Sequence, residues 1–146
     1  MPFPSYLTSF RSKLLYRAAG CVLTHPDAIK AVHKQYFEAG ADIATTATYQ
    51  ATMEGYMQKE NAGITRTEAD DLIRKGVALA IEARDQFWAD EVKKKGGRKR
   101  QRPLVAASVG CYGAAQADGS EYRGQYGLTV EEVGVLAKAH NLLGLL

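Results

Sequence analysis

Apolar positions along the chain fall into two patterns, which predict helices alternating with strands. From Pro26 they recur at helical spacing, because Ile29, Val32, His33, Tyr36 and Phe37 share one face. Proline suits a first helical position, where its missing N–H would be unpaired anyway, and Gly40 can adopt the left-handed conformation that ends a helix. We expect a helix over this stretch, with His33 as a hydrogen-bonded core residue rather than a ligand.

Two other segments lack helical spacing and are rich in small and β-branched residues. They are residues 43–49, Ile-Ala-Thr-Thr-Ala-Thr-Tyr, and residues 104–110, Leu-Val-Ala-Ala-Ser-Val-Gly. Runs without polar/apolar alternation are typical of parallel strands covered on both faces. Tyr49, Gln50 and Thr52 come where the first strand should end, and α/β enzymes carry their chemistry at the carboxyl ends of such strands.

Two helix start signals predict two further helices and complete the order of elements. Thr65 and Glu68 form a capping box, and so do Thr129 and Glu132. The helix after Thr65 carries one predicted apolar stripe, which comprises Ala69, Leu72, Ile73, Gly76, Val77, Ala80, Ile81, Phe87, Trp88 and Val92. Helix, strand, helix, strand and helix make an α/β chain with a parallel βαβ unit, whose two strands leave both outer sheet edges unpaired.

The segment 111–127 is rich in glycine and tyrosine and follows the second predicted strand. We expect a long loop, ordered by its three tyrosines and carrying function. Asp118, Glu121 and Arg123 are its clustered charges. They are suited to a zwitterionic or cationic ligand, or alternatively to organising the loop through hydrogen bonds.

Composition narrows the class of protein. The 146 residues fit one domain at most, and the net charge of +3 comes largely from a basic run at residues 93–102. Without interleaved aromatics this run is read as a solvated loop, with a nuclear or RNA-binding patch as the alternative; we expect no nucleic-acid partner and no membrane span. Cys21 and Cys111 have no CxxC spacing, which favours a reducing compartment without a local zinc site.

The first 20 residues form an atypical N-terminal segment. They contain Arg11, Lys13 and Arg17 but no acid before Asp27, a composition that resembles a mitochondrial transit peptide. An ordinary first helix is the other interpretation. We therefore expect a cytoplasmic protein, with a mitochondrial or plastid location as the alternative.

The sequence lacks a phosphate-binding P-loop, a Gly-x-Gly-x-x-Gly turn and a Gly-x-Ser-x-Gly elbow. Instead, residues 26–55, with Tyr49-Gln-Ala-Thr52, and residues 104–127, with Asp118-Gly-Ser-Glu-Tyr-Arg-Gly124, resemble homocysteine S-methyltransferases, most closely the plant members. The likeness covers about Cys21 to Val133. It implies a zinc-dependent (β/α)8 TIM barrel that moves a methyl group from S-methylmethionine or S-adenosylmethionine to homocysteine, giving methionine. Residues 21–146 would then be an incomplete homocysteine-binding domain.

The resemblance also implies where substrate would bind. Thr48, Tyr49 and Gln50 would line the pocket after the second barrel strand. Ser108, Gly110 and Tyr112 would do so after the third, and Asp118, Glu121 and Arg123 would approach the methyl donor from the loop beyond it. Each of these residues could instead be structural.

The chain also departs from the family pattern. Residues 1–20 lack the family's opening Asp-Gly-Gly, and the zinc cysteines belong to later strands that Cys21 and Cys111 do not match. We expect the front part of such an enzyme, without zinc ligands and inactive alone. One rival interpretation is a non-catalytic fragment that pairs with a full-length subunit through its open strand edges; another is a different, phosphate-binding barrel enzyme. The oligomeric state and the methyl donor are not predicted.

Overall fold

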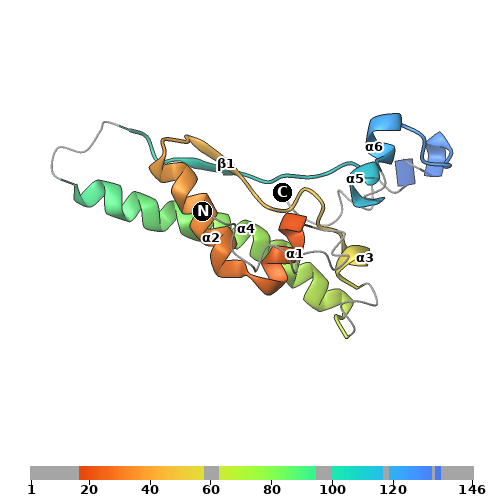
Figure 1. Ribbon diagram of the computed structural model, residues 1–146, viewed down its shortest axis with the longest axis horizontal. Helices are drawn as coiled ribbons and strands as arrows, with labels where there is room; N and C mark the ends of the chain where they lie inside the picture. Colours follow the sequence, from red (N-terminus) through yellow and green to blue (C-terminus); the bar gives the residue numbers. More distant parts are fainter. Residues whose placement is uncertain (1–16, 58–62, 95–99, 117–118, 133, 136–146) are drawn as a thin grey trace, which may run out of the picture.

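A computed structural model of the protein describes residues 17–57, 63–94, 100–116, 119–132 and 134–135. Within them, two short parallel strands lie along helices α1, α2 and α4, and the small helices α5 and α6 lie beyond the strand ends (Figure 1). The elements are α1 (Arg17–Thr24), α2 (Pro26–Glu38), β1 (Ile43–Thr45), α3 (Met53–Tyr56), α4 (Arg66–Lys93), β2 (Leu104–Ala106), α5 (Tyr112–Gln116) and α6 (Ser120–Arg123).

Helix α2 confirms the predicted helix but presents a narrower buried face. Pro26 opens it, and Gly40 follows its end with a positive φ of 112°. His33 and Phe37 are buried, and the Phe37 ring stacks on Phe87 of α4 at 5.8 Å. Val32 and Tyr36 are exposed, so the broader predicted face was wrong. The buried stripe follows i, i+4 spacing because α2 packs mainly on one partner, α4.

Helix α4 begins at the predicted capping box. The Thr65 N–H donates to Glu68 Oε2 (2.8 Å), and the Glu68 N–H donates to Thr65 Oγ1 (3.3 Å). Its buried residues are Ala69, Ile73, Gly76, Leu79, Ala80, Ala83 and Phe87. Ile81 and Val92, predicted in the stripe, are exposed because they lie on a flank of the helix away from this i, i+3/i+4 row.

The strands β1 and β2 pair in parallel, with Ala44 opposite Val105, which confirms the predicted βαβ unit. Both are shorter than predicted, ending at Thr45 and Ala106. Burial on both faces was also wrong: Ala44 is 6% exposed and packs with Phe37 and Phe87, whereas Ile43 and Leu104 are 56% and 61% exposed. Within the described ranges, helices cover only one face of this sheet.

The predicted loop at residues 111–127 contains the short helices α5 and α6, which corrects the prediction of a long loop. Tyr112 and Tyr126 pack edge to face at 5.6 Å, as expected of an ordered segment, but Tyr122 is exposed. The second capping box is confirmed, because the Glu132 N–H donates to Thr129 Oγ1 (3.2 Å) and residues 130–132 and 134–135 are helical.

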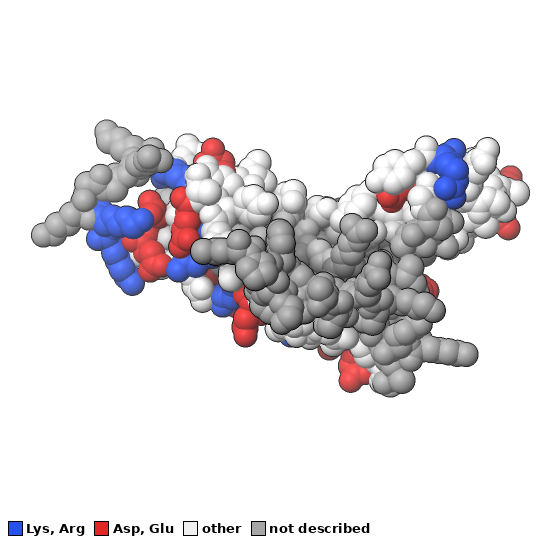
Figure 2. Space-filling model, in the orientation of Figure 1, with Lys and Arg blue, Asp and Glu red and all other residues white. Residues whose placement is uncertain are grey.

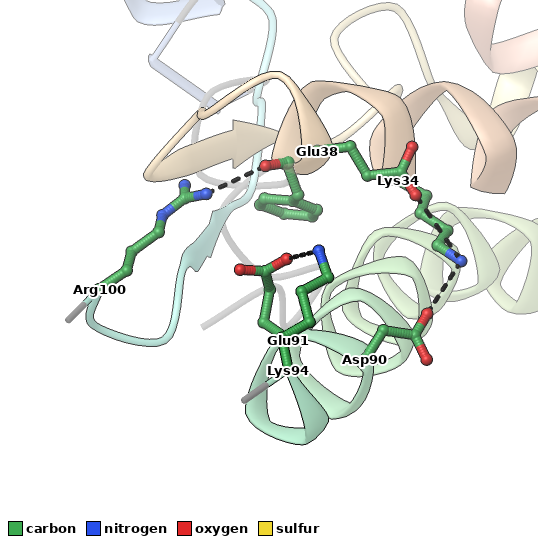
Figure 3. A network of polar contacts seen from close by, with 7 residues as sticks. Lys34, Glu38, Asp90, Glu91, Lys94 and Arg100 are labelled. Carbon is green, nitrogen blue, oxygen red and sulfur yellow. Dashed lines mark hydrogen bonds and ion pairs between the residues drawn. The ribbon is translucent and has the colours of Figure 1, made fainter. Parts of the chain in front are cut away.

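Arg100, from the basic run, turns inward rather than into solvent. Its side chain is 16% exposed; it donates to the carbonyls of Phe37 (3.0 Å) and Ala41, pairs with Asp42 and lies 5.3 Å from the Phe87 ring centroid. Figure 3 shows this guanidinium at the C-terminal end of α2. Arg100 therefore fastens the segment before β2 to the end of α2, which the prediction of a solvated loop did not include.

Lys and Arg side chains mix with Asp and Glu where α4 ends, at the left of Figure 2. Lys34 of α2 reaches Asp90 of α4 (3.2 Å), and Lys94 pairs with Glu91 (Figure 3). Exposed ion pairs of this kind each contribute about 0–1 kcal/mol to the free energy of unfolding, so they add little to the packing of α2 on α4. In the described ranges, no helix has the length and apolar character needed to cross a bilayer.

Candidate functional site

The segments that follow β1 and β2 meet beyond the carboxyl ends of the two strands. Thr48 Oγ1 donates to the Ser108 carbonyl (2.8 Å), and Gln50 Nε2 reaches the Ala114 carbonyl at 3.5 Å. Gly110 lies so close that a Cβ there would be 2.0 Å from the Tyr49 carbonyl oxygen. The fold therefore brings together residues predicted from both strands. We call the group Thr48, Tyr49, Gln50, Ser108, Gly110, Tyr112 and Glu121 the strand-end site.

The side chains of the site divide into buried and accessible groups. Thr48 is buried, with its hydroxyl in contact with Thr46 and Ser108, whereas Tyr49 is 48% exposed. Thr52, another strand-end candidate, accepts from the Gly55 N–H and caps α3. The groups available to a ligand are therefore the Tyr49 ring and its neighbours rather than the threonines.

A second cluster surrounds Cys111, directly after Gly110. The hydroxyls of Tyr49 and Tyr126 each hydrogen-bond with its sulfur. Negative charge on Cys111 is the main cause that raises the pKa of Tyr49, with smaller contributions from burial and Glu121; burial is the main cause that raises the pKa of Tyr126. Both phenols therefore stay protonated to a higher pH than an ordinary tyrosine.

Glu121 supplies a carboxylate to this cluster. Its Oε2 is buried and has no hydrogen-bond partner among the described residues. Buried carboxylate oxygens normally accept hydrogen bonds, and aromatic faces attract cations. The arrangement of Glu121, Tyr49, Tyr126 and Tyr112 is chemically suited to a cationic or ammonium-bearing ligand.

The other predicted site residues are less informative. Arg123 ends α6 on an exposed surface, with Nη1 close to Gly119. Asp118 lies outside the described residues. The structure therefore places Glu121 in the strand-end site.

Sequence reasoning missed Thr46, Cys111 and Tyr126 as members of this region. Thr46 was interpreted as an ordinary strand residue, although its spacing of two from Thr48 would put both hydroxyls on one face of an extended chain. Cys111 was considered only as a metal ligand. In the described part of the chain, no group of three or more His, Cys, Asp or Glu is arranged to hold a metal ion.

Comparison with known proteins identifies the family. The family described as homocysteine S-methyltransferase matches residues 6–140. The chain belongs to the homocysteine S-methyltransferase family. Homocysteine S-methyltransferase 1 of Arabidopsis thaliana is 49% identical over 113 residues, which are 77% of this chain and 33% of that protein. Homocysteine S-methyltransferase YbgG of Bacillus subtilis is 46% identical over 116 residues, covering 80% of this chain and 35% of its own.

The fold has a solved counterpart. The crystal structure of the homocysteine methyltransferase MmuM from Escherichia coli, in its metallated form, matches with a TM-score of 0.67 and 39% identity over 84% of this chain and 39% of that chain. This homocysteine S-methyltransferase chain thus spans about a third of the length of the curated relatives it matches.

Proposed function

We propose that the chain forms the front βα units of a (β/α)8 barrel and one wall of its substrate pocket. Residues 21–146 are then an incomplete homocysteine-binding domain, and residues 1–20 a separate N-terminal segment. The parallel β1–β2 pair, which the described helices cover on one face, supports this assignment. In a barrel the other face, with Ile43 and Leu104, points to the interior.

The complete enzyme transfers a methyl group from S-methylmethionine or S-adenosylmethionine to homocysteine. The homocysteine sulfur forms a bond to the methyl carbon while the carbon–sulfur bond of the sulfonium breaks, leaving a neutral thioether. Such an in-line displacement depends chiefly on positioning. The observation that carries the proposal is the strand-end site, where residues from two strands meet within one family-matched segment.

Within this pocket, Tyr49, Gln50 and Tyr112 form the wall, and Gly110, which has no side chain, lets the Tyr49 carbonyl approach closely. Glu121 accepts hydrogen bonds from a substrate ammonium or faces the sulfonium charge. Arg123 and Asp118 belong to the adjoining segment that approaches the donor. Thr48 and Ser108 support the wall from behind.

Zinc is the proposed family cofactor, since a bound metal ion keeps a thiol ionised near neutral pH. The residues described in this chain do not fit a zinc site, because no suitable group of three ligands occurs among them. The contribution of the chain is therefore restricted to binding and orienting substrate, and we expect no methyl transfer by the chain alone.

A segment-exchange experiment tests this function. The matched part of the Escherichia coli enzyme is replaced by residues 21–133 of this chain, and methionine formation is measured with each donor. We expect activity in the chimera, a higher KM after Tyr49→Phe or Glu121→Gln, and no change after Glu82→Gln, whose exposed carboxylate pairs with Lys30 of α2. A folded chimera that is inactive with both donors would contradict the proposal.

A second candidate function is a non-catalytic partner for a full-length subunit. Two observations favour it: in the part of the chain that the structure describes, the outer edges of β1 and β2 are unpaired, and Ile43 and Leu104 are exposed. Such edges accept further strands. Mixing the chain with a full-length relative should then produce a new peak in size-exclusion chromatography, whereas unchanged elution of both proteins counts against it.

A further inference from the structure

Two buried threonines after β1 form a closed hydrogen-bond circuit with the segment after β2. Thr46 and Thr48 are 4% and 3% exposed. The Ser108 N–H donates to Thr46 Oγ1 (2.9 Å), Thr48 Oγ1 donates to the Ser108 carbonyl (2.8 Å), and the two threonine oxygens are 2.6 Å apart.

The number of protons fixes the direction of this circuit. A hydroxyl has one proton to donate, and the proton of Thr48 is used on the Ser108 carbonyl. The Thr46 hydroxyl must therefore donate to Thr48, while it accepts from the Ser108 amide. The order is Ser108 N–H, Thr46 O–H, Thr48 O–H and Ser108 C=O, and removal of the Thr46 hydroxyl breaks two of the three bonds.

The circuit lies where the backbone ladder stops. The Thr46 N–H donates to the Ala106 carbonyl (3.0 Å), which continues the strand pairing just past β1. The chain then turns, and the Ala51 N–H donates to the Thr48 carbonyl (2.9 Å). Beyond Ala106, the circuit supplies side-chain bonds between the two segments in place of strand pairing. It holds them together at the point where they enter the strand-end site.

Helix α4 fixes the orientation of Thr48 from the other side. A Cβ at Gly76 would be 2.6 Å from Thr48 Cγ2 and 3.5 Å from Val22 Cγ2. The threonine methyl thus occupies the space that the missing side chain leaves, and its hydroxyl points into the circuit. Rotation about χ1 would exchange these two groups and break the circuit.

We infer that Thr46 is a positioning residue of the strand-end site, acting through the circuit to hold Tyr49 beside Gly110 and Cys111. Tyr49 directly follows Thr48, and Gly110 lies two residues after Ser108 in contact with the Tyr49 carbonyl. The role in substrate binding rests on the proposed function, but the positioning itself does not.

Three variants at two adjacent positions test the inference. Thr46→Val removes the hydroxyl but keeps the shape, Thr46→Ser keeps the hydroxyl, and Thr45→Val makes the same chemical change at an exposed neighbour. Each is made in the whole chain with Cys21→Ser, so that only Cys111 reacts with iodoacetamide. Ring-labelled tyrosine NMR, with Tyr49 assigned through Tyr49→Phe, follows the titration of this phenol.

In Thr46→Val we expect the titration midpoint of Tyr49 to fall toward about 10 and the Cys111 alkylation rate to change by about twofold or more, because the phenol no longer contacts the sulfur. Thr46→Ser and Thr45→Val should match the parent. The inference is overturned if Thr46→Val leaves both readouts unchanged, or if Thr46→Ser disturbs them equally. Amide exchange in the unaltered chain gives a test independent of variant folding: fast exchange at Ser108 would also overturn it. None of these readouts uses substrate, so failure here is distinct from failure of the chimera.

Discussion

The contact between α4 and Thr48 makes Gly76→Ala a sharp test of the packing. Alanine in a helix interior is favoured over glycine by about 1 kcal/mol. In this structure the added Cβ would lie 2.6 Å from Thr48 Cγ2, and relief requires either a backbone shift or rotation of a buried threonine. Overpacking of this kind costs about 1–3 kcal/mol. We expect a net loss of up to about 2 kcal/mol in the free energy of unfolding.

Urea unfolding, followed by far-ultraviolet circular dichroism, measures this loss. Thr48→Ser removes the obstructing methyl group but keeps the hydroxyl, and alone it should cost about 1 kcal/mol for one buried methyl. In the double variant the clash disappears, so its loss should be smaller than the sum of the single losses by the overpacking cost, about 1–3 kcal/mol. Lys75→Ala, on the exposed side of α4, is the control for helix propensity.

A gain in the free energy of unfolding, instead of a loss, would refute this account of the packing. If Gly76→Ala stabilises the protein by about 1 kcal/mol, as an unhindered helix glycine should, then α4 does not lie as close to Thr48 as the structure describes. Simple additivity of Gly76→Ala and Thr48→Ser would lead to the same conclusion, because residues in contact normally show coupling.

Three further changes probe buried polar groups by the same unfolding assay. Arg100→Lys removes the guanidinium that reaches two carbonyls and the face of the Phe87 ring, so we expect the free energy of unfolding to fall by about 1–3 kcal/mol. An unchanged unfolding midpoint would contradict this expectation. Burial lowers the pKa of His33, so below about pH 6.5 the unfolded chain binds the extra proton first. Stability should therefore fall as the pH decreases from 7.5 to 5.5, less steeply in His33→Asn, and equal slopes would count against a buried neutral imidazole. Burial raises the pKa of Tyr56, which donates to the Ala19 carbonyl (2.8 Å), to about 12. The unfolded phenol ionises first, so up to about 3 kcal/mol should be lost between pH 10 and 12, and Tyr56→Phe should remove this part of the alkaline loss.

Features governed by residues three or four positions apart could be predicted from the sequence. The Thr65–Glu68 and Thr129–Glu132 capping boxes form as expected, and α2 begins at Pro26, because each depends on neighbouring backbone groups. The alternation of helices and parallel strands follows from the same local signals. The strand-end residues were predicted from the rule that connects strand ends with function, and the fold brings most of them together.

Features that depend on distant partners could not be predicted. The ends of the strands are set by bonds such as Thr48 to Ser108, sixty residues apart, which no periodicity contains. Exposure of Ile43 and Leu104 reflects which face the helices cover, not the residues themselves. The inward turn of Arg100 depends on the carbonyls of Phe37 and Ala41 near the end of α2 and on the Phe87 ring, so a run of bases alone did not indicate it.

The orientation of Arg100 and its neighbours changes how the basic run would interact with other molecules. Arg100, Arg102 and Lys94 each face a carboxylate, on Asp42, Asp85 and Glu91 respectively. A polyanion that approached this end would have to displace these acids rather than small counterions. For these three side chains, the gain in entropy from ion release, which usually drives such association, is then small.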